Sequence, residues 1–183
     1  MRVIAGTAKS LQLKAPKGMD TRPTTDRIKE TLFNMIWQEL YDVSFLDLFS
    51  GSGGIGIEAL SRGASRAVFV EKSKEACDII RQNLETTHFT DKSMLMCSSA
   101  VSAIERLAGK EKFSVVFMDP PYNMGLEKEI LRLPSFNEVL EEKALIIIEA
   151  DIKTDFLPEE YRGFNLLKEK KYKTNKHVFF EKA

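Results

Sequence analysis

The chain has 183 residues, 43% of them hydrophobic and 30% charged, which suits one globular domain with a sizeable core over residues 1–183. Its 27 basic residues balance its 27 acidic ones, so the net charge alone indicates no polyanionic partner. No segment approaches the ~20 apolar residues of a membrane-spanning helix, and the opening MRVIAGTAKS lacks the apolar segment of a signal peptide. Neither a membrane protein nor a secreted one is therefore expected.

The first part of the chain predicts a small hairpin followed by a helix. We expect strands at RVIAG (2–6) and LQLKAP (11–16) and a helix over about residues 25–40, where N-cap residue types precede an apolar stripe. The hairpin would form an N-terminal extension of residues 1–23, ahead of a core of residues 24–183.

Short apolar runs and segments of helical periodicity alternate along the rest of the chain. The expected strands are residues 45–49, 67–71, 94–97, 113–119 and 144–149. The expected helices are residues 55–62, 74–87, 102–108 and 126–140. This order predicts a doubly wound, Rossmann-like α/β fold with right-handed crossovers. Residues 164–173 and 177–182, joined by TNK, predict two final strands with a tight turn, so the last strand would run antiparallel.

The cysteines give no sign of a metal site. Cys77 and Cys97 have no metal-ligand spacing, and two thiols in a chain of this length suggest a reduced protein. We expect both side chains to pack as small hydrophobic groups, and we expect a cytoplasmic location.

A glycine-rich segment, DLFSGSGGIGIEAL, joins the first expected core strand to the next helix. Gly51, Gly53 and Gly56 fit the G-x-G-x-x-G pattern, in which glycine permits a tight turn and close approach of a ligand to the backbone. Glu71 ends the following strand, where a carboxylate can accept hydrogen bonds from both ribose hydroxyls. The glycines alone could serve only packing, but with the strand order and the acid they predict a nucleoside site.

NAD and S-adenosylmethionine both bind to this architecture. NAD needs its pyrophosphate at the helix N-terminus, whereas S-adenosylmethionine has an ammonium that needs acceptors. Asp47 and the carbonyls of Phe49 to Gly51 could supply these acceptors. A dehydrogenase would also need a substrate acid or base, but His88 and His177 do not follow parallel strands and fit surface or core roles better. The sequence therefore favours S-adenosylmethionine.

The segment FMDPPYN predicts the chemistry. Two prolines cannot continue a central strand, so Asp119 begins a loop at the same sheet edge as the glycine loop. An amine on an aromatic ring is a poor nucleophile because its lone pair is delocalised. If Asp119 and the Pro120 carbonyl, fixed by Pro121, accept the two amine hydrogens, that lone pair is directed at the methyl sulfonium. Tyr122 could stack on an unstacked base. A strand-ending acid and a covering tyrosine remain the structural alternative.

These segments resemble a known family. RVIAG, TRPTTDRIKETLFN, FSGSGGIGIEALSRGA and MDPPY, in this order, are similar to the RsmD family of class I S-adenosylmethionine-dependent methyltransferases. The resemblance covers essentially the whole chain. It implies a seven-stranded sheet of order 3-2-1-4-5-7-6 with an antiparallel seventh strand, and methylation of N2 of a guanine in 16S ribosomal RNA, guanine-966 by its usual name.

The resemblance also implies roles for individual residues. The cofactor-binding set would be Asp47, Phe49, Gly51, Gly53, Gly56, Glu71, Lys72, Ser99, Ala100 and Asp119, and the catalytic set Asp119, Pro120, Pro121 and Tyr122. Family members commonly place Asp or Asn near residue 99 to contact the adenine amino group. This chain reads CSSA there, and Ser99 could still accept that hydrogen bond, but more weakly.

Both ends of the chain are basic. Residues 1–31 hold seven Lys or Arg against three Asp or Glu, and residues 168–182 hold six against two. These ends could contact RNA phosphates, although such runs are more often solvated faces. The expected RNA-binding residues are Arg2, Lys9, Lys14, Arg22, Lys170, Lys171 and Lys173.

The expected partner is 16S rRNA, within a 30S subunit or assembly intermediate, and a monomer is favoured. Two alternatives stay open at this point. An adenine N6-methyltransferase acting on DNA or RNA would use the same DPPY segment, because that segment recognises an amine and not a particular base. A non-catalytic nucleotide-binding module would keep the glycine loop and have no use for DPPY.

Overall fold

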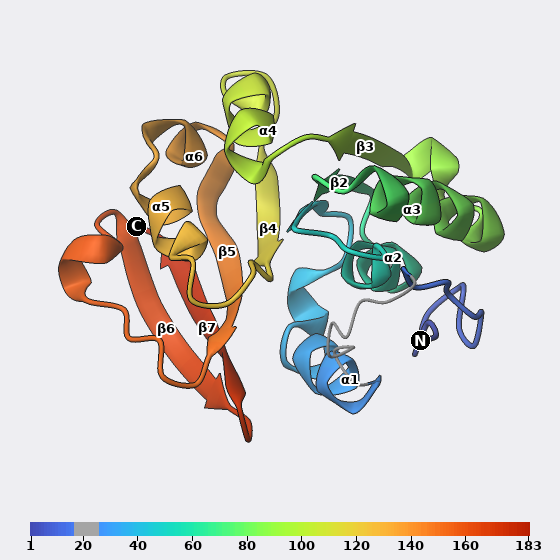
Figure 1. Cartoon of the computed structure of the whole chain (residues 1–183), viewed down its shortest axis with the longest axis horizontal. Coiled ribbons are helices and arrows are strands. Elements are labelled where there is room, and N and C mark those ends of the chain that lie inside the picture. The colour runs from blue at the N-terminus through green and yellow to red at the C-terminus, as the bar shows by residue number, and fades with distance from the viewer. Residues whose placement is uncertain (17–25) are drawn as a thin grey trace.

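The protein is described by a computed structural model that covers residues 1–16 and 26–183. Its seven strands form one sheet of order β3-β2-β1-β4-β5-β7-β6, in which β7 runs antiparallel to both neighbours (Figure 1). The strands are β1 (Ser44–Leu48), β2 (Arg66–Glu71), β3 (Ser93–Cys97), β4 (Phe113–Met118), β5 (Leu140–Asp151), β6 (Phe164–Lys171) and β7 (Asn175–Lys182). The expected sheet order and the antiparallel last strand are confirmed.

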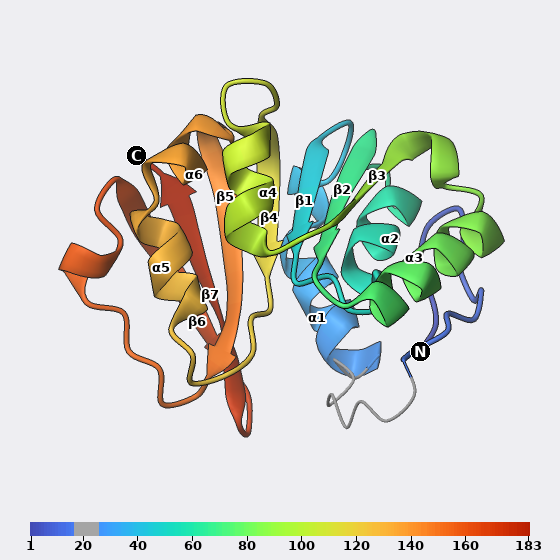
Figure 2. The same ribbon diagram turned by 45° about the horizontal axis from the view of Figure 1, so that its top comes forward.

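Helices cover both faces of the sheet (Figures 1 and 2). They are α1 (Asp26–Met35), α2 (Gly54–Ser61), α3 (Lys74–Thr87), α4 (Ala100–Leu107), α5 (Leu126–Arg132) and α6 (Pro134–Glu138), with short 3-10 turns η1 (Trp37–Glu39), η2 (Thr90–Lys92) and η3 (Pro158–Glu160). Leu46 and Val116 point to the face covered by α4, α5 and α6, while Phe45 and Val115 point to the face covered by α1, α2 and α3. Burial on both faces explains the continuous apolar runs of these strands.

The reversal of strand order beside β1 positions the candidate site. β1 lies between β2 and β4, and Leu48 pairs with both Val70 and Met118. The loops that follow these three strands therefore begin at the same level and diverge to opposite sides. In open α/β sheets this arrangement forms a crevice at the carboxyl edge of the strands, where ligands bind.

Several of the expected helices and strands differ from the observed ones. The helix expected to reach residue 40 ends at Met35 and continues as η1. The helix expected over residues 126–140 is two helices, because Leu133 precedes a proline and is extended, with φ −70° and ψ 125°. The N-terminal hairpin is reduced to one antiparallel bridge between Arg2 and Gln12. The expected boundary between residues 23 and 24 lies outside the described residues.

The N-terminal segment is attached to α2 by a buried carboxylate. Glu58 accepts hydrogen bonds from the amides of Ile4 and Ala5 at 2.8 and 3.0 Å. Its carboxylate also pairs with Lys29 at 3.2 Å and with Arg62 at 2.8 Å. Burial lowers the pKa of Lys29, although its pairing with Glu58 opposes this effect. A paired, hydrogen-bonded charge of this kind fixes the geometry of the segments that it joins.

Gly6 is required where this segment crosses α2. Its φ is +84°, and an added Cβ would lie 1.7 Å from the Ser61 carbonyl oxygen. We expect Gly6→Ala to lower the free energy of unfolding by roughly 2–4 kcal/mol or to detach the segment locally. Chemical denaturation, with hydrogen exchange at the Thr7 and Ala8 amides that bind Ser61, would measure this loss.

Gly109→Ala is the matched control for that prediction. Gly109 also has a positive φ, +69°, but a Cβ there would meet only the end of Glu138, at 4.0 Å. It should cost only the backbone strain of about 1–2 kcal/mol. Equal losses in the two variants would show that the Ser61 contact is unimportant.

None of the helices within residues 1–16 and 26–183 has the length and apolar character needed to cross a bilayer.

Candidate active site

The loop after β1 is a tight turn built from left-handed residues. Phe49, Gly51 and Gly53 have φ values of 64°, 55° and 77°. The Ser50 hydroxyl donates to the Asp47 carbonyl at 2.7 Å and accepts from the Val70 amide at 3.0 Å, which attaches the turn to β2. The turn delivers the chain into α2 with its backbone facing the crevice.

Glycine is needed at the three positions of this segment for different structural reasons. A Cβ on Gly51 would meet nothing within 4 Å, so this glycine serves the positive φ and leaves open space before the backbone. Gly56 lies inside α2, and a Cβ there would lie 2.4 Å from the Phe69 ring. Gly53 combines a positive φ with ordinary contact distances of 3.4 Å. Of these three glycines, Gly56 is therefore needed for packing of the helix on Phe69, and only Gly51 borders open space.

Asp47 lies under this loop. Its side chain is buried, and Oδ2 accepts a hydrogen bond from the Gly56 amide at 3.0 Å. Burial raises the pKa of Asp47 to about 7, because the Gly56 hydrogen bond only partly offsets desolvation and the charge of Glu71 adds to it. A cation bound beside Asp47 would lower this raised pKa and so favour the ionised carboxylate.

Glu71 connects the loops after β1 and β2. Its carboxylate accepts from the Gly51 amide at 2.9 Å and from the Ser73 amide at 2.8 Å. These bonds orient the carboxylate at the carboxyl edge, and each oxygen retains a second acceptor position. Lys72, beside it, is exposed.

The segment after β3 gives Ser99 a structural role. Ser99 is the N-cap of α4, and its hydroxyl accepts from the Ser102 amide at 3.2 Å. Ala100 is buried in the first turn of that helix. The CSSA segment is thus explained locally by helix capping, which needs no ligand.

The loop after β4 presents a carboxylate with no donor. Its first residue, Asp119, follows β4 and lies next to β1, where its amide donates to the Leu48 carbonyl at 3.4 Å. Within the described part of the chain, no donor contacts the Asp119 side chain. Burial, with the charges of Glu149 and then Asp47, raises the pKa of Asp119 well above its usual value. Among the described residues no fully buried side-chain oxygen lacks a partner, so the Asp119 carboxylate is an acceptor open to solvent or to a ligand.

The rest of the DPPY segment differs in exposure. Pro120 is buried, Pro121 is exposed, and Tyr122 keeps 36% of its surface accessible. The Tyr122 hydroxyl donates to Glu149 Oε1 at 3.2 Å. Burial and the charge of Glu149 raise the pKa of this phenol, so it stays a donor at neutral pH.

The structure adds residues that the sequence analysis did not select. Glu149, near the end of β5, accepts from the Asn175 amide group at 2.6 Å and lies 3.2 Å from His177 Nε2. His177 is fully buried and also lies 3.2 Å from the Tyr172 hydroxyl, so its expected core role fits its position. The signal available in the sequence was the acid that ends ALIIIE, because Asp47, Glu71 and Asp119 also lie at or near strand ends.

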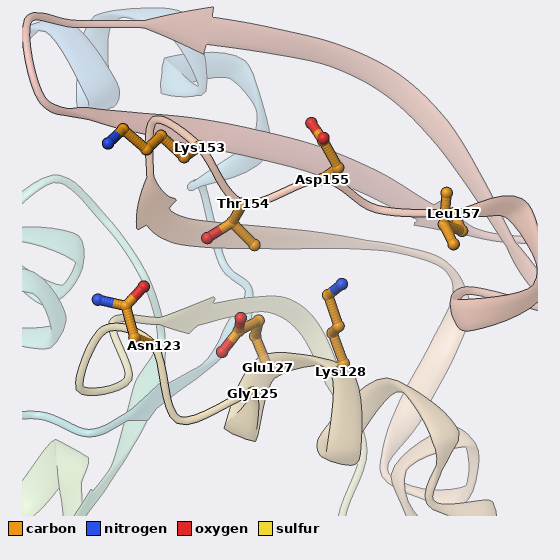
Figure 3. A pocket seen from close by; sticks show the side chains of 8 residues that line it. All are labelled: Asn123, Gly125, Glu127, Lys128, Lys153, Thr154, Asp155 and Leu157. Carbon is orange, nitrogen blue, oxygen red and sulfur yellow. The ribbon is translucent and has the colours of Figure 1, made fainter.

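A groove of about 550 Å³ opens beside the loop after β4 (Figure 3). Asn123, Glu127 and Lys128 form one wall, and the segment from Lys153 to Leu157 forms the other. None of the expected site residues lines this groove. The groove therefore borders the chain just after Tyr122 and shares no lining residue with the glycine loop, Glu71 or Asp119.

The expected RNA-binding residues flank the crevice on two sides. Lys170 pairs with His177 opposite Glu149, so Lys171, at the end of β6, and Lys173, in the turn that follows, lie beside the carboxyl end of β5. On the other side, the Lys14 backbone and the Ser52 carbonyl both bind Asn83 of α3. The N-terminal segment thus lies beside the glycine loop.

These basic side chains are not equally available. Arg2 pairs with Asp26 at 3.3 Å, and Lys14 donates to Gln82 at 2.7 Å, whereas Lys9, Lys170, Lys171 and Lys173 are exposed. Arg22 lies outside the described residues.

Comparison with known proteins gives a consistent result. The proteins called ribosomal RNA small subunit methyltransferase D from Haemophilus influenzae and Escherichia coli are 33% and 34% identical, each matching 93% of this chain and 88% and 84% of their own lengths. YlbH of Bacillus subtilis is 42% identical over 87% of this chain and 86% of its own. The solved yhhF structure from Escherichia coli superposes with a TM-score of 0.85 at 31% identity, covering 100% of this chain and 97% of its own. A family model described as "Conserved hypothetical protein 95" matches residues 1–181, and the chain therefore belongs to this family, the RsmD methyltransferases.

Proposed function

We propose that the protein transfers a methyl group from S-adenosylmethionine to the exocyclic N2 of a guanine in 16S rRNA, the guanine-966 type of target. The observation that carries the proposal is the donor-free carboxylate of Asp119, held at the carboxyl edge beside the glycine loop. The names of the relatives, small-subunit rRNA methyltransferases, support the substrate class.

The crevice offers a place for each part of the cofactor. In this assignment Asp47 and the carbonyls of Phe49 to Gly51 meet the methionine ammonium, and Glu71 accepts from the ribose hydroxyls. The open space before Gly51 and the orientation of Glu71 support it. Lys72, Ser99 and Ala100 would border the adenine, with Ser99 as a weaker acceptor because it already caps α4.

The target amine would lie between Asp119 and the Pro120 carbonyl. When these groups accept its two hydrogens, the nitrogen lone pair is directed away from the purine ring and towards the sulfonium methyl. Bound S-adenosylmethionine would supply the methyl group to N2, the electrons of the broken C–S bond would stay on sulfur, and the Asp119 carboxylate would accept the amine proton that is lost. An acceptor whose interaction strengthens as the nitrogen becomes cationic stabilises the transition state more than the ground state.

Tyr122 would hold the base. Its partly exposed ring can stack on an unstacked nucleotide, a contact worth roughly 1–3 kcal/mol per base. A guanine extruded from the RNA in this way exposes its amine to the crevice.

The decisive experiment is tritium transfer from labelled S-adenosylmethionine. We expect label in 30S particles or 16S rRNA from cells that lack the modification, at N2 of one guanine. Label at adenine N6, in DNA or RNA, would favour the alternative target, and no transfer at all would favour a binding module. We also propose a 30S context, a monomeric protein and a cytoplasmic location, which follow from a ribosomal substrate.

RNA binding should depend strongly on salt if the basic residues contact phosphates. Each phosphate contact releases counterions, so replacing both Lys170 and Lys171 by alanine should weaken binding and reduce the logarithmic salt slope by about two. Filter binding of 16S rRNA between low and physiological salt measures this slope. Lys112→Ala is the control, because this exposed lysine precedes β4 at the opposite edge of the sheet. An unchanged slope in the double variant would mean that these lysines are only solvated charges.

A further inference from the structure

We propose that Glu149 is a positioning residue that fixes the Tyr122 ring for the target base through a hydrogen-bond network. The network is completed by Asn175 and His177 of β7 and by Tyr172, which lies between β6 and β7. The inference rests on the proposed function, because it concerns the same site. Glu149 does not need to touch the substrate in this role. It acts through the tyrosine hydroxyl.

Three side chains donate to the Glu149 carboxylate. Oε1 receives Asn175 Nδ2 at 2.6 Å and the Tyr122 hydroxyl at 3.2 Å, and Oε2 lies 3.2 Å from His177 Nε2. Glu149 keeps only 5% of its surface accessible. Burial favours the neutral acid, but the hydrogen bonds and charge of His177, with Asn175 and Tyr122, lower the pKa of Glu149 overall. The carboxylate is therefore a fixed acceptor.

The imidazole behind Glu149 is also held on every side. A carboxylate can only accept, so Nε2 carries the hydrogen, and the Tyr172 hydroxyl lies 3.2 Å from Nδ1. The rings of Phe117 and Phe179 pack edge-on against it, with centroids 6.2 and 6.4 Å away. His177 thus fixes the carboxylate and leaves it little rotational freedom.

Tyr122 needs such an anchor. It follows two prolines and precedes Asn123 and Gly125, which have φ values of 63° and 68°. Its ring is partly exposed, and its hydroxyl donates to Glu149 and also hydrogen-bonds with the Asn175 side chain of the same network. A ring that must receive an incoming base gains orientation from a hydrogen bond at its hydroxyl, because that group lies in the ring plane and leaves the ring faces free for stacking.

A double-mutant cycle tests the proposal. Tyr122→Phe keeps the ring and removes the hydroxyl, while Glu149→Gln removes the charged acceptor. We expect each to lower the single-turnover rate of methyl transfer into 30S particles about tenfold, as expected for loss of a hydrogen bond to a charged group. S-adenosylmethionine affinity should change less than about twofold. In the Tyr122→Phe background, Glu149→Gln should add almost nothing, because the two residues act through one bond.

Additive losses in this cycle would overturn the proposal, since Glu149 would then act independently of Tyr122. Glu141→Gln is the control, because this exposed glutamate lies on the same strand and, among the described residues, accepts only from Ser114. If Glu149→Gln does not fold, Tyr172→Phe, which removes the outer hydroxyl, replaces it under the same criterion of non-additivity. An inactive wild-type protein would refute the proposed function, whereas an active wild type with an equally active Glu149→Gln variant would refute only this inference.

Discussion

Replacing Asp119 by alanine is expected to lower the single-turnover rate of methyl transfer by about 10²- to 10⁴-fold, the range typical of a residue that assists proton loss from the reacting group. The structure supplies the reason, because Asp119 has no donor within the described residues and lies beside two further carboxylates. RNA and cofactor affinity should fall only modestly, since the interaction develops mainly in the transition state.

The stability of the same variant distinguishes catalysis from folding. The raised pKa of Asp119 shows that its ionised form is disfavoured in the folded protein. Asp119→Ala should therefore unfold at the same temperature as the wild type or higher near neutral pH. Asp119→Asn keeps an acceptor oxygen and removes the charge, so its residual rate measures how much of the effect is orientation.

The pH profile gives an independent check on Asp119. The acceptor must be ionised, so the wild-type rate should decrease as the pH falls through its raised pKa. Asp91→Asn, an exposed residue in η2, should retain both the wild-type rate and its pH profile. A near-normal rate of methyl transfer in a folded Asp119→Ala variant would show that the DPPY segment is not the catalytic centre.

Asp47→Asn should weaken S-adenosylmethionine binding at least tenfold and stabilise the ligand-free protein. The folded-state pKa is raised from 3.8 to about 7. The Asp47 carboxyl therefore contributes to the free energy of unfolding below pH ~4, where it is protonated, and this contribution is lost as the pH rises to about 7. The asparagine variant lacks this loss, so its free energy of unfolding at pH 8 should be higher, by up to about 4 kcal/mol.

Proton release on cofactor binding measures the same linkage. If the cofactor ammonium needs ionised Asp47, binding at pH 6 should release close to one proton, and binding at pH 8 very few. Calorimetry in two buffers of different ionisation enthalpy gives the number. Asp78→Asn, which removes a surface partner of Arg81, is the control. Unchanged S-adenosylmethionine affinity in the Asp47→Asn variant would show that the cofactor ammonium does not bind beside Asp47.

Local patterns predicted the core elements of the fold well. The strands β1, β2, β3 and β4 lie within a residue or so of their expected positions; β1, β2 and β4 are continuously apolar because they are buried on both faces, whereas β3 is a partly exposed edge strand. Because Asp47, Glu71 and Asp119 lie at or near the ends of predicted parallel strands, the sequence also placed them at the carboxyl edge of the sheet. The strand order came from the family resemblance, since apolar runs alone do not determine which strands pair.

The parts that were missed depend on contacts between distant residues. Glu149 and His177 are 28 residues apart, and only the antiparallel register of β5 and β7 brings them together. Similarly, the two expected N-terminal strands form a single bridge because Glu58 binds the Ile4 and Ala5 amides. Ser99 stays a predicted adenine contact, and the structure adds a helix-capping role for its hydroxyl that the sequence analysis did not consider.

β7 follows both β5 and β6 in the chain but lies between them in the sheet. Phe179 and Phe180 from β7 are fully buried in opposite halves of the core. During translation, β5 therefore exposes an unpaired edge until β7 has left the ribosome, and the nascent chain is open to aggregation for that time. Shortening the chain by about ten residues would remove an interior strand together with His177. Extra residues after Ala183, which is exposed, would add length without disturbing the sheet.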